Sequence, residues 1–174
     1  MEKAKFADSY QKYADAIYRH CYYKVYDREQ ARDLAQQTFA RVWEYLTQGK
    51  QIKNMRAFLY QTARNLVVDY YRSKKPVSLD DLREDGFEPA GNAGEDPVQK
   101  LESEDIKRLL LKLKEDEREL IIMRYIDGLK PQEIAEVMDE TANVISVRLH
   151  RAGKNFKKIC QQHGYQLWKN LTNN

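Results

Sequence analysis

The sequence predicts an all-α protein with two small helical domains joined by an acidic flexible linker, the C-terminal domain being a helix-turn-helix. Apolar residues recur at helical spacings of three and four on both sides of a central segment, and neither side shows the alternation of a β-strand. The central segment, residues 76–100, holds three of the four prolines and three of the seven glycines and has no apolar period. We therefore expect domains at residues 1–75 and 101–174, with a linker at 76–100.

The N-terminal domain is expected to contain three helices. The second runs through residues 28–46 and ends near Gly49, because glycine readily adopts the left-handed conformation that closes a helix. The third spans about residues 54–73. The apolar face of the first helix consists of Phe6, Tyr10, Tyr13, Ile17 and Cys21.

The third predicted helix has two chemically different faces on a helical wheel. Its apolar face consists of Phe58, Leu59, Thr62, Ala63, Leu66, Val67 and Tyr70. Its opposite face consists of Gln61, Arg64, Asn65, Val68 and Arg72. Guanidinium groups suit phosphates and a carboxamide suits base edges, so this face fits either nucleic acid or, with equal weight on charge alone, an ordinary solvated surface.

The C-terminal domain contains the pattern of a helix-turn-helix. Gly128 ends one helix, and Pro131 lies in the first turn of the next, where its missing N–H costs nothing. After the turn at residues 139–141, Thr141 is suited to cap the last helix. Two helices joined by so tight a turn are typical of a DNA-binding motif.

The last predicted helix is apolar on one side and cationic on the other. Its inner face consists of Ile145, Leu149, Ala152, Phe156 and Ile159. Its outer face consists of Asn143, Ser146, Val147, His150, Arg151, Lys154, Lys157 and Lys158. The small polar residues suit base edges and the cations suit phosphates. Arg148 lies at the margin, where a phosphate contact and an internal ion pair are equally compatible with the pattern.

The charge distribution supports contact with polyanions. Residues 1–75 carry a net charge of +7, residues 76–106 of −8, residues 107–140 of −2 and residues 141–174 of +6. Two cationic units therefore flank an acidic strip, which is either a solvated spacer or an occupant of a basic channel in a partner.

Several classes of protein are disfavoured. No apolar run approaches the roughly 18 residues of a membrane span, and the N-terminus lacks the apolar stretch of a signal peptide, so we expect a cytoplasmic protein without membrane insertion. Cys21 and Cys160 lie far apart, without a ligand cluster, and are expected to be free, buried thiols. No carboxylate pair, metal-ligand cluster or Gly-rich phosphate loop is evident, so we expect no catalytic residue, no metal, no cofactor and no enzymatic activity. Glu136, Asp139 and Glu140 fit a solvated charge run.

The order of these parts resembles a bacterial RNA polymerase sigma factor of the two-domain extracytoplasmic-function (ECF) group. The resemblance rests on DREQARDLAQQTFARVWEYL (27–46), NMRAFLYQTARNLVVDYYRSKK (54–75), LKEDERELIIMRYIDGLKPQEIAEVM (113–138) and VRLHRA (147–152). It implies a subunit that binds core RNA polymerase and directs promoter-specific initiation by recognising and opening promoter DNA. Residues 1–75 would be sigma region two and residues 101–174 sigma region four with a short C-terminal tail.

The resemblance also implies roles for individual residues. Contact with the polymerase clamp helices would involve Asp33, Gln36, Gln37, Arg41 and Trp43, while Leu34 and Phe39 would pack internally. Recognition of the minus-ten element would involve Lys53, Asn54, Arg56, Gln61, Arg64, Asn65, Arg72 and Lys74. Recognition of the minus-thirty-five element would involve Thr141, Asn143, Ser146, Val147, Arg148, His150, Arg151 and Lys154.

The expected partners are core RNA polymerase, through its clamp helices and flap, promoter DNA, and an anti-sigma factor. The chain departs from the family at Asp139, where glycine is frequent, but aspartate tolerates that turn geometry. The alternative is a stand-alone helix-turn-helix regulator. Such regulators usually dimerise to read paired half-sites, and no second apolar seam is evident.

Overall fold

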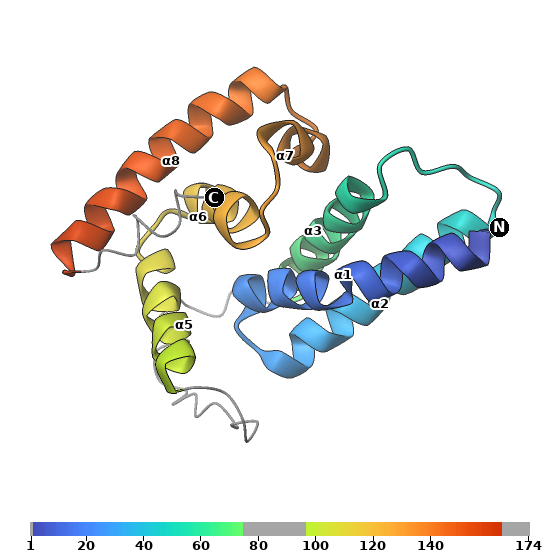
Figure 1. Ribbon diagram of the computed structural model, residues 1–174, viewed down its shortest axis with the longest axis horizontal. Coiled ribbons are helices and arrows are strands. Elements are labelled where there is room, and N and C mark those ends of the chain that lie inside the picture. The colour runs from blue at the N-terminus through green and yellow to red at the C-terminus, as the bar shows by residue number, and fades with distance from the viewer. Residues whose placement is uncertain (1, 75–96, 165–174) are drawn as a thin grey trace.

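The computed structural model describes residues 2–74 and 97–164, with side-chain positions for residues 6–74 and 104–164 (Figure 1). Every regular element in these ranges is helical, so the all-α prediction is confirmed. The acidic stretch at 76–96 and the tail after residue 164 lie outside the described residues. Helix α5 begins at Pro97, within the last residues of the segment expected to be linker.

The N-terminal unit is a bundle of three helices that pack pairwise on one another. It consists of α1 (Glu2–Val25), α2 (Arg28–Thr47) and α3 (Met55–Ser73). Asp27 and Asn54 cap α2 and α3 by accepting hydrogen bonds from backbone N–H groups at 3.0 Å and 3.2 Å. Gly49 has a φ of 74° just after α2, which confirms its predicted part in ending that helix.

One predicted core position of this unit is wrong. Tyr10 is 48% exposed, because its ring lies against Phe39 of α2 on one side, at a centroid distance of 4.8 Å, and leaves its remainder to solvent. Ile17 and Cys21, further along the same stripe, are buried. The three-and-four pattern thus predicts which side of α1 faces the bundle, but not how far the bundle covers it.

The C-terminal unit is built around the long helix α8, on which α5, α6 and α7 pack. Its elements are α5 (Pro97–Leu110), α6 (Glu115–Ile121), the π-helical turn η1 (Ile122–Ile126), α7 (Pro131–Met138) and α8 (Ala142–Gln162). The helix-turn-helix is confirmed: Pro131 begins α7, and Thr141 caps α8 by accepting a hydrogen bond from the Val144 N–H at 3.3 Å. Asp139 adopts the left-handed conformation between these helices, with a φ of 55°.

The two units pack directly against each other. Helix α3 contacts α7, and α1 contacts η1, so α7 lies beside one end of α3 (Figure 1). Side chains from both units join one contiguous apolar core. This arrangement determines which of the predicted functional residues face solvent.

Candidate nucleic-acid interface

The outer face of α8 is open to solvent. Ile145, Leu149 and Phe156 are buried against the rest of the C-terminal unit, which turns the opposite side of the helix outward. The exposed side chains are Asn143, Ser146, Val147, His150, Arg151, Lys154, Lys157 and Lys158. A continuous exposed helical face that begins with small polar groups and continues with cations fits the major groove and its flanking phosphates.

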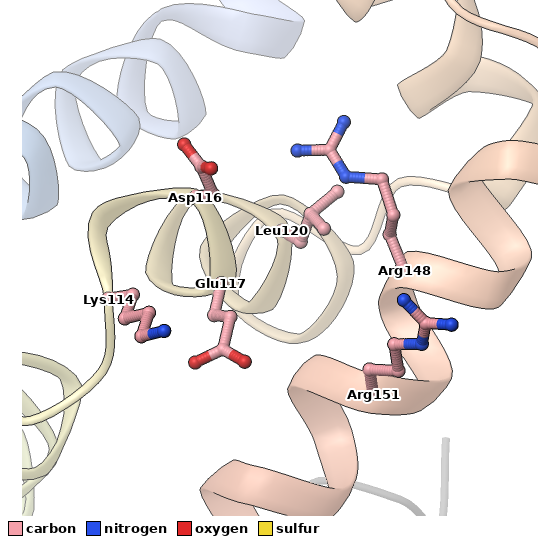
Figure 2. A pocket seen from close by; sticks show the side chains of 6 residues that line it. All are labelled: Lys114, Asp116, Glu117, Leu120, Arg148 and Arg151. Carbon is pink, nitrogen blue, oxygen red and sulfur yellow. The ribbon is translucent and has the colours of Figure 1, made fainter.

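Arg148 and Arg151 lie along the seam between α8 and α6. Together with Lys114, Asp116, Glu117 and Leu120 they line a hollow of about 230 Å³. Figure 2 shows both arginine side chains extending from α8. Arg148 is partly buried and forms an ion pair with Glu140 at 3.8 Å, which corresponds to the internal pair that its marginal position allowed. Arg151 is exposed and free to reach a phosphate.

Part of the surface predicted to bind the minus-ten element is turned toward the C-terminal unit. Arg56 donates from Nη1 to both carboxylate oxygens of Glu133 at 3.2 Å and from Nη2 to the Asp127 carbonyl at 2.9 Å. Arg64 donates to the two carboxylate oxygens of Glu119 at 3.0 Å and 3.3 Å. These guanidiniums therefore already hold anions in the free chain.

Carboxamides on the same face contact α7. Asn54 Nδ2 donates to Glu136 Oε2 at 2.9 Å, and Gln61 Nε2 approaches the Glu136 carbonyl at 3.5 Å. The interpretation of Glu136 as part of a solvated charge run is therefore incomplete, since its carboxylate binds the cap residue of α3. The spatial proximity of α3 and α7, which are far apart in sequence, produces this contact.

Glu119 is the centre of a charged cluster that joins three helices. Besides Arg64 of α3, it accepts a hydrogen bond from Lys24 Nζ of α1 at 2.7 Å. Burial by itself would raise the pKa of Glu119, but the charges and hydrogen bonds of Lys24 and Arg64 outweigh burial, and the pKa is lowered. Burial has the opposite effect on a cation: it lowers the pKa of Lys24, although the charge and hydrogen bond of Glu119 oppose this shift.

The remaining predicted minus-ten residues stay on the surface. Lys53, Asn65, Arg72 and Lys74 are exposed, and Lys74 donates to the Tyr70 hydroxyl. The polar face of α3 is therefore divided into a part covered by the C-terminal unit and a part open to solvent. The wheel placed these residues correctly on one side of the helix, but it could not indicate this division.

The residues predicted to contact polymerase lie on the outer side of α2. Asp33, Gln36, Gln37 and Arg41 are exposed, whereas Leu34 and Phe39 are buried, as expected. Gln37 donates to Asp33 at 2.6 Å, one helical turn away. Trp43 is half-buried, and with Phe6, Tyr10, Phe39 and Ala40 it lines a shallow apolar groove beside this surface.

Sequence reasoning missed the buried polar contact between the units. His20 Nδ1 of α1 lies 2.6 Å from Asp127 Oδ2 at the end of η1, and both side chains are fully buried. Tyr60 of α3 is also buried and packs edge-on against the His20 ring, at a centroid distance of 5.1 Å. His20 directly precedes the apolar-stripe residue Cys21, and that position is the one signal the sequence offers.

Two further findings bear on possible functions. Within residues 2–74 and 97–164, no helix is both long and apolar enough to cross a bilayer. Among the described residues, no group of three or more His, Cys, Asp and Glu side chains is placed to hold a metal ion. Cys21 and Cys160 are free and buried, as predicted.

Comparison with known proteins accounts for both units. Residues 9–77 match Sigma-70 region 2, and residues 103–155 match Sigma-70, region 4. The chain is 32% identical over 163 residues to the ECF RNA polymerase sigma factor SigW of Bacillus subtilis, which covers 88% of this chain and 87% of that protein. It is 31% identical over 154 residues to the sigma factor SigM of the same organism, covering 86% and 91%.

Two solved structures have the same fold. CnrH, in complex with the cytosolic domain of CnrY, aligns with a TM-score of 0.69 and 19% identity over 92% of this chain and 90% of that chain. RpoE of Bartonella quintana, in complex with the anti-sigma factor NepR, aligns with a TM-score of 0.67 and 20% identity over 90% and 97%. The chain therefore belongs to the ECF group of RNA polymerase sigma factors, the subunits that bind core polymerase and direct promoter-specific transcription initiation.

Proposed function

We propose that the two helical units of this sigma factor divide promoter recognition between them. Residues 1–75, as region two, bind core polymerase and capture the opened minus-ten strand, and residues 101–174, as region four, bind duplex DNA upstream. The observation that supports this best is the exposed basic face of α8 on a complete helix-turn-helix. The match over both units leaves no reason to retain a stand-alone regulator as the alternative.

The upstream element is read by α8. Asn143, Ser146 and His150 face outward where base edges would lie, and the cations further along the helix meet phosphates. The remaining members of this proposed set are Thr141, Val147, Arg148, Arg151 and Lys154. Arg148 has to exchange its pair with Glu140 for a phosphate, or else it stays a structural residue.

The minus-ten strand is captured by α3 and the loop before it. A base can be read from a melted strand because its hydrogen-bonding edge is no longer hidden in the stack. Asn65 and Arg72 are exposed and available for this contact, and Lys53 and Lys74 supply further positive charge. Asn54, Arg56, Gln61 and Arg64 complete the proposed set once they are released from α6 and α7.

Polymerase binds the outer side of α2. Asp33 and Gln37 lie one turn apart on the exposed surface and present a carboxylate and a carboxamide to the clamp helices. Gln36, Arg41 and Trp43 flank them. We propose that region four meets the flap, so that core polymerase holds the two DNA-binding units at a fixed spacing.

The protein acts in the cytoplasm and performs no chemistry of its own. CnrH was solved in complex with the cytosolic domain of CnrY, and the sigma factor RpoE of B. quintana was solved in complex with the anti-sigma factor NepR. An anti-sigma factor is a corresponding candidate partner for this chain.

Reconstituted transcription tests this function. The purified chain is mixed with core RNA polymerase and a library of promoter fragments, and the transcripts are sequenced. We expect a stable complex and transcripts that share upstream and minus-ten motifs. A chain that forms no complex and yields no promoter-dependent transcript would refute the assignment of roles.

A further inference from the structure

The outer face of α8 carries an apolar patch among its polar and cationic residues. Val144 is 40% exposed and Val147 is 48% exposed, although valine is a residue that folded chains usually bury. The two residues are three positions apart, so their side chains are neighbours on the helix surface. Asn143, His150 and Arg151 lie one turn before or after Val147, and all three are exposed. We refer to Val144 and Val147 as the valine patch.

Packing of the chain does not account for the valine patch. The core side of α8 is formed by Ile145, Leu149 and Phe156, which are buried. At about 100° per residue, Val147 lies about 160° from Ile145 and therefore faces away from the core. β-Branched residues also form helices less readily than alanine, lysine or arginine, so an exposed valine slightly destabilises the helix that carries it. The patch thus indicates a contact outside the chain.

The valine patch lies in the part of α8 that would enter a major groove. In a helix-turn-helix, the N-terminal residues of the second helix contact base edges. Val144 and Val147 are the third and sixth residues of α8, and Asn143 and Ser146 occupy the same turns. The exposed cations begin at Arg151, one turn later. The patch is therefore at the level of the bases rather than of the phosphates.

Thymine is the one base that offers an apolar group in the major groove. Its C5-methyl group lies at the groove edge, whereas the other base positions there present hydrogen-bond donors and acceptors. A valine placed against a donor or acceptor would displace water without replacing its hydrogen bond, which costs free energy. Against the thymine methyl group, both partners bury apolar surface, which is favourable. The chemistry of the valine patch therefore selects a T·A pair.

Charge favours DNA over a protein as the ligand of this face. From Thr141 onward the chain has six Lys or Arg residues and no Asp or Glu. Four of these cations are exposed on α8, namely Arg151, Lys154, Lys157 and Lys158. An apolar protein surface would leave them without anionic partners, whereas a duplex places phosphates on both sides of each base edge. The valine patch and the cations therefore fit one ligand.

We propose that Val147, extended by Val144, recognises the C5-methyl group of a thymine in the upstream promoter element. The inference rests on the proposed binding of α8 to the upstream duplex, and it goes beyond that function by naming the base and the atom that are recognised. The contact distinguishes T·A from the other base pairs at that position without a hydrogen bond. Asn143, Ser146 and His150 are left to contact neighbouring base edges by hydrogen bonds.

Replacement of thymine by deoxyuridine tests this contact, because it removes the methyl group and keeps every hydrogen-bonding group of the base pair. The full chain is assembled with core RNA polymerase, and the upstream element is selected from promoter duplexes randomised over that region. Each thymine of the selected element, on either strand, is then replaced singly by deoxyuridine. We expect one or two positions at which the wild type binds the thymine duplex about fourfold more tightly, the factor for one buried methyl group. A selected element without thymine, or equal binding of both duplexes at every position, would overturn the proposal.

Substitution of Val147 links the methyl dependence to this side chain. Val147→Thr keeps one of the two methyl groups of valine, and Val147→Ser keeps neither. Both variants should fold, because the position is exposed and the three residue types have similar helix propensities. At the methyl-dependent position, the ratio of thymine to deoxyuridine affinity should fall from about fourfold to about twofold in Val147→Thr and to about one in Val147→Ser. A ratio that stays at about fourfold in Val147→Ser would refute the role of Val147.

Two further variants define the patch. Val144→Ser removes the neighbouring apolar group and should lower the same ratio to about twofold, whereas an unchanged ratio would refute the part assigned to Val144. Leu111→Ser is the matched control, since Leu111 is 40% exposed but lies directly after α5. It removes an exposed apolar side chain from the same unit and should leave the ratio at about fourfold. Loss of the ratio in Leu111→Ser would show a general effect of lost apolar surface and would contradict the proposal.

The same measurements separate this inference from its alternatives. If Val147→Ser weakens assembly with core polymerase while the ratio of thymine to deoxyuridine affinity is unchanged, the patch contacts protein and the proposal is refuted. If no upstream element is enriched at all, the proposed function of α8 fails together with this inference. An enriched element whose thymines are all independent of the methyl group leaves the sigma-factor roles intact and refutes this inference alone.

Discussion

Arg151 is an exposed cation on α8 whose contribution can be measured alone. If it meets a backbone phosphate, Arg151→Ala releases one fewer counterion, and the slope of log affinity against log salt falls by about one unit. Binding should weaken by a similar factor on duplexes of any sequence. Titration of an upstream duplex at several salt concentrations measures both effects. A loss confined to one base sequence would instead indicate base readout.

Asn65 tests the other DNA contact. Its exposed carboxamide on α3 is suited to a base edge, so Asn65→Ala should reduce the population of open promoter complexes about tenfold. This factor corresponds to about 1.4 kcal/mol, which lies within the range of about 1–3 kcal/mol for one good base contact. Permanganate reactivity of the melted region reports the opening. Upstream duplex binding should be unchanged. Identical behaviour of Asn65→Ala and Arg151→Ala would refute the division of labour.

Cys21 reports the integrity of the core. Burial, followed by the nearby charge of Asp127, raises the pKa of its thiol to about 12. Because the thiolate is the reactive form, Cys21 in the folded protein should not react with iodoacetamide at about pH 8, whereas the urea-unfolded chain should react readily. Peptide mass spectrometry separates Cys21 from Cys160. Rapid modification of native Cys21 would show that this part of α1 opens.

Thr141 carries a prediction at the scale of an element. Its side chain accepts the Val144 N–H at 3.3 Å and caps α8, the helix on which the C-terminal unit is built. Thr141→Ala should lower the free energy of unfolding by about 1 kcal/mol, whereas Thr141→Ser should retain most of it because serine caps equally well. Urea unfolding followed by circular dichroism measures the difference. Equal stability of both variants would show that the cap contributes nothing.

The positions of the helices could be predicted from the sequence. How far neighbouring helices cover each of them could not. The wheel of α8 assigned its inner and outer faces correctly, because a single helix buries one stripe against its neighbours. The wheel of α3 assigned Tyr60 to neither face, yet Tyr60 is buried and packs edge-on against His20 of α1. Tyr10 is exposed because too little of the bundle reaches it.

The packed arrangement of the two units should lose stability at low pH. The pKa of Glu119 is lowered by Lys24 from α1 and Arg64 from α3, so the ionised carboxylate stabilises the folded, closed state. This contribution is fully present above the ordinary pKa of glutamate and is lost as pH falls through the lowered pKa, so stability should drop as the pH is lowered below that ordinary value. Thermal unfolding across this range should show a shallower pH dependence for Glu119→Gln. An identical pH profile for the variant and the wild type would show that the ionised Glu119 carboxylate does not contribute to stability.

The sequence by itself determined the helical class, the helix-turn-helix, the exposed cationic face of α8 and the polar face of α3. These properties follow from local periodicity, capping residues and composition, which act within one helix or one turn. Only the tertiary structure decided that Arg56 and Arg64 hold Glu133 and Glu119 and that His20 meets Asp127. The partners in these pairs stand far apart in the chain, and a pattern within one helix contains no information about which distant carboxylate will be brought against it.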